Sequence, residues 1–147
     1  MITKSILRKL MGEKLKDAEI LINKNRYGTG FYIGGYVIEL FLKLQICKVF
    51  KFWKGYPEDD NEFKFYKNNS RINTHPFNAI KKVKDLKIHN LNDLLYYSGI
   101  EYKIKSILLS EWNLIENWSP NIRYKIIDLN KDEALNKIKA IKSLIKA

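Results

Sequence analysis

Apolar residues recur at every third or fourth position along four stretches of this chain, which is the spacing of an amphipathic helix. The stretches cover about residues 3–24, 29–52, 102–118 and 131–145. The clearest of them carries its apolar positions at Leu7, Met11, Leu15, Ala18 and Ile22. Because nearly all the periodic segments are helical, we predict an all-α fold, an up-and-down bundle of four or five helices.

Residues that start and stop helices agree with these boundaries. Pro120 ends the third segment, and Asn130 with Glu133 forms an Asn-x-x-Glu variant of the capping box at the start of the fourth. Shorter helices are predicted over about residues 76–84 and 90–99.

The helical period disappears between residues 53 and 75, where turn-forming residues accumulate. They are Gly55, Pro57, Asp59, Asp60, Asn61, Asn68, Asn69 and Ser70. We predict a long loop or insertion here, and the alternation of Phe63 and Phe65 around Lys64 is compatible with a short edge strand. Loops of this length are uncommon in compact domains unless they are functional or disordered.

Glycine is concentrated at the start of the second predicted helix. Gly28, Gly30, Gly34 and Gly35 are four of the seven glycines in the protein. Each costs a helix interior about 1 kcal/mol relative to alanine. Close approach of another element, or a helix that begins only near residue 30, would explain them. Their spacing is not the GxGxxG of a phosphate-binding loop.

Length and composition set further limits. A chain of 147 residues is the size of one domain, and the single Cys47 excludes an intramolecular disulfide. The uncharged stretch 27–38 is shorter than the roughly 20 residues of a membrane span. Charged residues interrupt the N-terminus before an apolar signal sequence could form. We therefore expect a single domain over residues 1–147, no membrane association and a cytoplasmic location.

The net charge of +11 is suggestive of a polyanionic partner, and it is concentrated in residues 48–87, which hold ten basic and five acidic side chains. Only four of the 27 basic residues are arginine: Arg8, Arg26, Arg71 and Arg123. Lysine, isoleucine and asparagine all have A/T-rich codons, so an A/T-rich genome explains part of the lysine content. The arginines are therefore the more informative cations, because their forked donors match phosphate.

Metal and nucleophilic chemistry find little support in the sequence. The two histidines and one cysteine are far apart and have no metal-binding spacing, and no GxSxG segment is present. We expect neither a metal nor a cofactor.

Glu39 is the most informative polar residue of the second predicted helix. It lies four residues before Lys43 and is flanked by apolar residues on both sides, so its carboxylate is expected at the edge of the core. A buried carboxylate needs a partner. We predict an ionic contact of Glu39 with either Arg123 or Lys43.

Several short segments together resemble the HEPN domain (higher eukaryotes and prokaryotes nucleotide-binding). They lie between Leu15 and Tyr124. The segments are Ala18-Glu19-Ile20-Leu21, Arg26-Tyr27, Gly34-Gly35-Tyr36, Glu39-Leu40, Leu42-Lys43, His89 to Leu95, and Trp118 followed by Arg123-Tyr124. The resemblance implies a helical bundle that dimerises, in a prokaryotic toxin–antitoxin or phage-defence system, often beside a nucleotidyltransferase. It favours Glu39, Lys43, His89, Arg123 and Tyr124 as a ligand-binding polar cluster.

Some members of that family are metal-independent ribonucleases with an Arg and a His separated by four to six residues. This chain departs from that pattern, because its nearest match, Arg71 and His75, has three intervening residues. The leading hypothesis is therefore a homodimeric protein that binds RNA or a nucleotide. The alternatives are an endoribonuclease that uses Arg71 and His75, and a protein partner of a nucleotidyltransferase.

Overall fold

The computed structural model describes residues 1–69, 80 and 83–147. Within these ranges the regular elements are helices, and the one β-type pairing is an antiparallel bridge between Ile2 and Tyr56. The helices are α1 (Lys4–Asn23), α2 (Tyr27–Val49), α3 (Asp60–Asn69), η1 (Val83–Asp85), α5 (Leu91–Tyr97), α6 (Glu101–Ile107), α7 (Leu109–Asn113), η2 (Pro120–Tyr124) and α8 (Lys131–Leu144). The predicted all-α class is confirmed.

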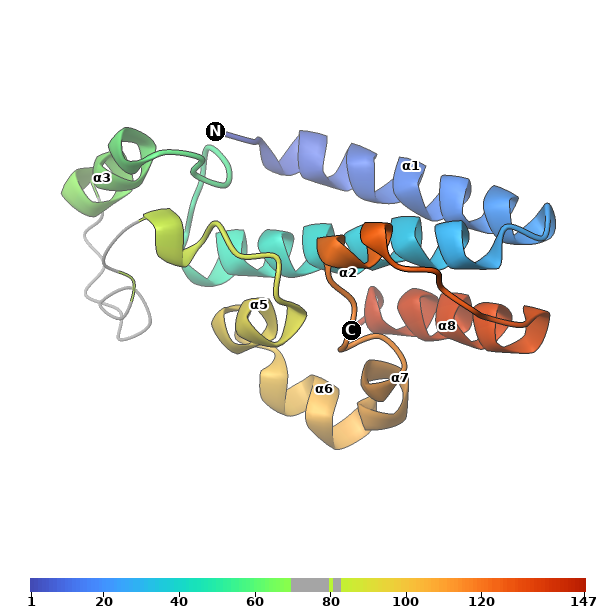
Figure 1. Ribbon diagram of the computed structural model, residues 1–147. Helices are drawn as coiled ribbons and strands as arrows, with labels where there is room; N and C mark the ends of the chain where they lie inside the picture. Colours follow the sequence, from blue (N-terminus) through green and yellow to red (C-terminus); the bar gives the residue numbers. More distant parts are fainter. Residues whose placement is uncertain (70–79, 81–82) are drawn as a thin grey trace.

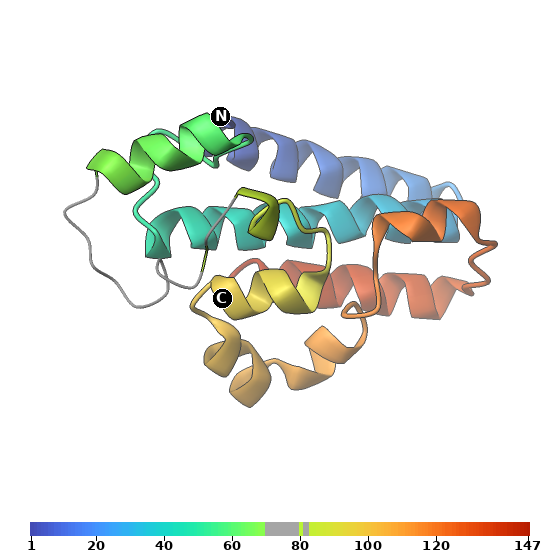
Figure 2. The same ribbon diagram turned by 60° about the vertical axis from the view of Figure 1, so that its left-hand side comes forward.

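Helix α2 forms the centre of the bundle. Helix α1 runs antiparallel along one side of it, and α8 lies along another side. Helix α5 also packs against α2, while α6 and α7 lie farther from it (Figures 1 and 2). By length and composition α2 could cross a membrane, but 67% of its most apolar 18-residue window is buried inside the protein. Its apolar character is that of a core helix packed on several sides.

Two glycines of α2 allow the neighbouring helices to approach it closely. A Cβ added at Gly30 would lie 2.6 Å from Ile22 of α1, and one at Gly34 would lie 2.8 Å from Ile141 of α8. Because α2 begins at Tyr27, a late helix start does not explain the glycine cluster. Close approach, the other explanation offered by the sequence, does.

Part of the predicted loop or insertion over 53–75 is helical, because α3 forms within it. Phe63 and Tyr66 are three residues apart on one face of this helix and are buried, so the short edge strand with which the alternation of Phe63 and Phe65 was compatible does not form. The turn-forming residues act at the helix start, where the Asp59 carboxylate accepts a hydrogen bond from the Glu62 N–H at 2.8 Å. Apolar side chains on that single face offset the low helix propensity of the asparagines.

The later helices follow the predicted order with one break. The single helix predicted over 102–118 is interrupted at Leu108, where the backbone leaves helical geometry (φ −124°, ψ 31°) between α6 and α7. The capping box of Asn130 and Glu133 opens α8 as predicted. Helix α5 likewise begins after its cap Asn90. Apart from η1, most of the helix predicted over 76–84 lies outside the described residues.

Candidate functional site

A polar face runs along the otherwise apolar helix α2. Tyr32, Tyr36, Glu39 and Lys43 follow each other at spacings of four, three and four residues, so they share one side of the helix. The Tyr32 and Tyr36 hydroxyl groups lie 3.0 Å apart in a hydrogen bond. Burial, followed by this hydrogen bond, raises the pKa of Tyr36 to about 12. The Tyr36 hydroxyl therefore stays protonated near neutral pH.

Glu39 anchors the next part of this polar face. Its carboxylate side chain is 5% exposed and accepts a hydrogen bond from Lys43 Nζ at 2.6 Å. His89 Nδ1 lies 3.1 Å from each carboxylate oxygen. The predicted pair of Glu39 with Lys43, with His89 beside it, is therefore present in the structure.

The position of His89 follows from the start of α5. The next residue, Asn90, caps that helix by accepting a hydrogen bond from the Asp93 N–H at 3.1 Å. With Nδ1 turned toward the buried carboxylate, the opposite edge of the ring is directed outward, and the His89 side chain is 58% exposed. Glu39 therefore orients the imidazole, and Nε2 makes no hydrogen bond to the described residues.

The segment 118–127, here called the strap, crosses the first half of α2. At one end the Trp118 Nε1–H donates to the Tyr32 carbonyl at 3.0 Å, and its ring meets Tyr36 edge-on at 4.8 Å between centroids. A Cβ at Gly35 would lie only 2.1 Å from the Trp118 ring. At the other end, Ile127 packs on Gly28, where an added Cβ would lie 2.9 Å from the Ile127 carbonyl oxygen. The strap needs both glycines to lie this close to α2.

Arg123 lies in the middle of the strap, on η2. Its guanidinium lies 4.8 Å from the centroid of the Tyr124 ring, and the side chain is exposed. Hydrogen bonding to the Tyr124 hydroxyl, with a smaller contribution from the Tyr32 hydroxyl, raises the pKa of Arg123, which stays charged. Of the two partners predicted for Glu39, the described residues form the pair with Lys43 and not with Arg123.

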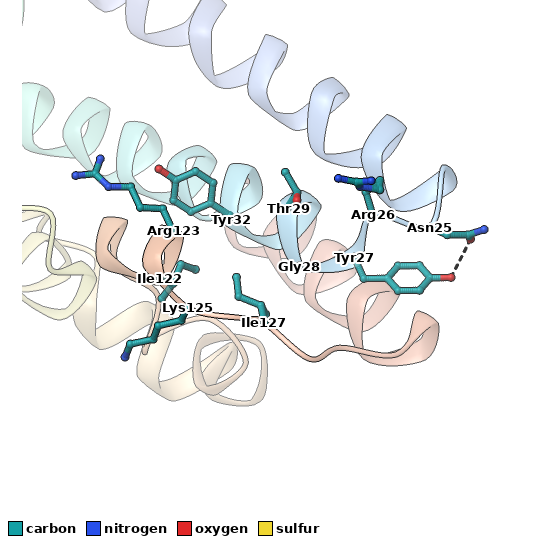
Figure 3. Close-up of a pocket in the computed structure, with 10 residues that line it drawn as sticks. All are labelled: Asn25, Arg26, Tyr27, Gly28, Thr29, Tyr32, Ile122, Arg123, Lys125 and Ile127. Carbon is teal, nitrogen blue, oxygen red and sulfur yellow. Dashed lines mark hydrogen bonds between the residues drawn. The ribbon is translucent and has the colours of Figure 1, made fainter.

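Two clefts lie against the strap. The first, of about 600 Å³, lies between the start of α2 and the strap; its walls are Asn25, Arg26, Tyr27, Gly28, Thr29, Tyr32, Ile122, Arg123, Lys125 and Ile127 (Figure 3). The second, of about 500 Å³, is lined by Tyr36, His89, Asn90, Ser119, Pro120, Asn121 and Arg123. Arg123 belongs to both clefts. Among the described residues, no aspartate or glutamate lines either one.

Three cationic residues line the first cleft, and their charged groups point in different directions (Figure 3). Arg26 lies at the α1–α2 turn and Lys125 on the strap, while the Arg123 guanidinium extends past the Tyr32 hydroxyl, away from Arg26 (Figure 3). The N-terminus of α2, which is the positive end of its helix dipole, lies beside this cleft. No acidic residue in the first turn and no side-chain cap from Arg26 offset this positive charge. Arginine, lysine and hydroxyl groups without a competing carboxylate are the donors that bind phosphate.

The structure groups only part of the predicted site. Glu39, Lys43 and His89 lie together, and Arg123 shares the second cleft with His89 while Tyr124 lies under the Arg123 guanidinium. Arg71 and His75 lie outside the described residues. No described residue of the basic block 48–87 lines either cleft.

Three residues of the clefts were missed from the sequence: Lys125 as a cation that lines the first cleft, and Tyr32 and Tyr36 as polar groups. The tyrosines had a detectable signal, because their spacing to Glu39 and Lys43 places all four on one helix face. The role of Lys125 depends on how the strap folds back, for which no local pattern exists.

Two further findings bear on the site. The described residues hold no group of three or more histidine, cysteine, aspartate or glutamate side chains placed to bind a metal. No protein-family model, curated protein or solved structure matches this chain.

Proposed function

We propose that this protein binds RNA or a nucleotide, with phosphate held in the first cleft. The observation that supports this most directly is the set of three cations, Arg26, Arg123 and Lys125, around one cleft that no described carboxylate lines. Two of them are arginines, in a chain that contains only four. Tyr32 and Thr29 add hydroxyl groups on the α2 side. This donor set suits a phosphate better than a neutral or cationic ligand.

The test is a titration of labelled single-stranded RNA and of nucleoside triphosphates at 50 and 200 mM salt. Three phosphate contacts to a single strand weaken binding about 20-fold over this range, since the logarithm of affinity falls with a slope of about −0.7 per contact. Arg123→Ala should weaken binding and flatten the salt dependence. Lys9→Ala, an exposed lysine on the distant half of α1, removes the same charge and should leave affinity unchanged. Salt-insensitive binding, or none, would refute the proposal.

The proposal extends the resemblance to HEPN domains. With it we propose the setting that the resemblance implies: a homodimer in a toxin–antitoxin or phage-defence system, in contact with a nucleotidyltransferase. Analytical ultracentrifugation of the purified protein tests the dimer. Co-purification with a neighbouring nucleotidyltransferase tests the partner.

A second candidate function, metal-independent RNA cleavage, is favoured by one arrangement in the second cleft. Glu39 orients His89 through Nδ1, and Arg123 lines the same cleft. An oriented imidazole suits proton abstraction from a ribose 2′-hydroxyl, and an arginine suits stabilisation of the charged phosphate that results.

This candidate differs from the Arg71 and His75 hypothesis in which histidine it needs. RNA incubated with the protein in EDTA should be cut, and cleavage should be lost in His89→Ala but kept in His75→Ala. The opposite result would favour the pair outside the described residues. Intact RNA with the parent protein would reject cleavage altogether and leave binding as the function.

A further inference from the structure

The two clefts are parts of one continuous surface along α2. Arg123 lines both of them, and Tyr32 of the first is hydrogen-bonded to Tyr36 of the second at 3.0 Å. The Arg123 guanidinium lies past the Tyr32 hydroxyl rather than beside Arg26 (Figure 3). The shared arginine is therefore placed where the two clefts meet.

Each cleft has the size of a site for one small ligand. Their volumes, about 600 and 500 Å³, both lie within the range of about 300–1,000 Å³ that is usual for such sites. A single mononucleotide would occupy one cleft and leave the other empty. Two linked nucleotides would occupy both.

The two clefts carry different chemical groups: those of the first suit the phosphates of a nucleotide chain, and those of the second suit its bases. The first holds Arg26 and Lys125, which suit phosphate. The second holds two amide side chains, Asn90 and Asn121, and an aromatic residue, Tyr36. The side-chain oxygen of Asn90 accepts the capping hydrogen bond from the Asp93 N–H at the start of α5, so the NH₂ group of this side chain remains to donate. Amides and aromatic rings are the groups that bind unpaired bases.

From this arrangement we infer that the ligand is a single-stranded oligonucleotide that lies across both clefts, with the phosphodiester between two nucleotides at Arg123. The inference rests on the proposed function and specifies its ligand class. A base-paired strand keeps its bases stacked inside the duplex and would leave the second cleft empty.

A length series tests the inference. Uridine monophosphate, pUpU, pUpUpU and a pentanucleotide are titrated, together with the matching thymidylates and a duplex. Affinity should rise at least about tenfold from one nucleotide to two and then level off, and the salt slope should steepen from about −0.7 to about −1.4 as the second phosphate contact is added. The same dependence on length in either the ribo or the deoxyribo series supports the inference.

Variants in each cleft separate the two halves of the site. Arg26→Ala, in the first cleft, and Asn121→Ala, in the second, should both weaken the trinucleotide, whereas only one of them should affect the mononucleotide. Arg123→Lys keeps the charge but loses the forked donor, so it should weaken the trinucleotide while the fold stays intact by circular dichroism. Lys9→Ala should match the parent.

Two results would overturn the inference while leaving the proposed function in place: equal affinity for one and three nucleotides, or equal affinity for the duplex and the single strand. Failure to bind any nucleotide or nucleic acid would instead remove the proposed function itself.

Discussion

Replacing Gly35 by alanine tests whether the strap depends on the bare backbone of α2. In a helix this change ordinarily stabilises by about 1 kcal/mol. Here the new Cβ would lie 2.1 Å from Trp118 Nε1 and from Cε2, and 2.3 Å from Cδ1, so the indole must move. A contact that close is far inside van der Waals distance, and the rigid ring has no flexible end to yield.

The expected magnitude follows from what Trp118 would lose. Its Nε1–H bond to the Tyr32 carbonyl contributes about 1 kcal/mol, and its edge contact with Tyr36 about 1 kcal/mol more. Overpacking of a core by one methyl group costs about 1–3 kcal/mol. After the gain of about 1 kcal/mol in helix propensity, we expect Gly35→Ala to destabilise the fold by about 2–4 kcal/mol.

Gly12 provides the matched control. It lies on the exposed side of α1, and an added Cβ there would meet no atom within 4 Å. Gly12→Ala should therefore stabilise by about 0.5–1 kcal/mol. Urea unfolding followed by circular dichroism gives both free energies. If Gly35→Ala moves the denaturant midpoint upward as Gly12→Ala does, the close packing of Trp118 on α2 is wrong.

Three further predictions address the polar groups. Glu39→Gln leaves the 13% exposed Lys43 without its charge partner and should lower the free energy of unfolding by about 3 kcal/mol in chemical denaturation. The control Glu101→Gln, in an exposed pair, should lower it by under about 0.5 kcal/mol. Equal costs would show that the burial of Glu39 has no energetic effect. Asn130→Ala removes the α8 cap and should lower the free energy of unfolding by about 1 kcal/mol, and an unchanged midpoint would contradict this. The folded-state pKa of Tyr36 is raised from 10.0 to about 12, so the unfolded state releases this proton first and the free energy of unfolding falls as pH rises from 10 toward 12. In unfolding measured across that range, Tyr36→Phe should lessen the fall by up to about 1.4 kcal/mol per pH unit. A pH profile parallel to that of the parent protein would argue against the raised pKa.

Features that depend on neighbours in sequence were predictable. The capping box of α8 and the pairing of Glu39 with Lys43 each join residues three or four apart, so the helical repeat alone brings them together. The position of His89 beside Glu39 was expected only through the resemblance to a known family, because 50 residues separate them.

Features that depend on chain reversal were not predictable. The sequence could show that Gly28 and Gly35 needed an explanation, but not that the strap supplies it. Helix α3 was missed for a different reason: Asp59 and its polar neighbours are equally suited to a turn and to a helix start, and burial of Phe63 and Tyr66 decides between the two.

The strap is fixed to α2 at two places, by Trp118 on Gly35 and by Ile127 on Gly28. These glycines are seven residues apart, about two helical turns, and Arg123 lies between the two fixed points. A backbone held at both ends needs little ordering when a ligand arrives, so the entropic penalty of binding falls mainly on the long side chains of Arg123 and its neighbours. Affinity for different ligands would then be set by how these side chains rearrange on a backbone that is already in place.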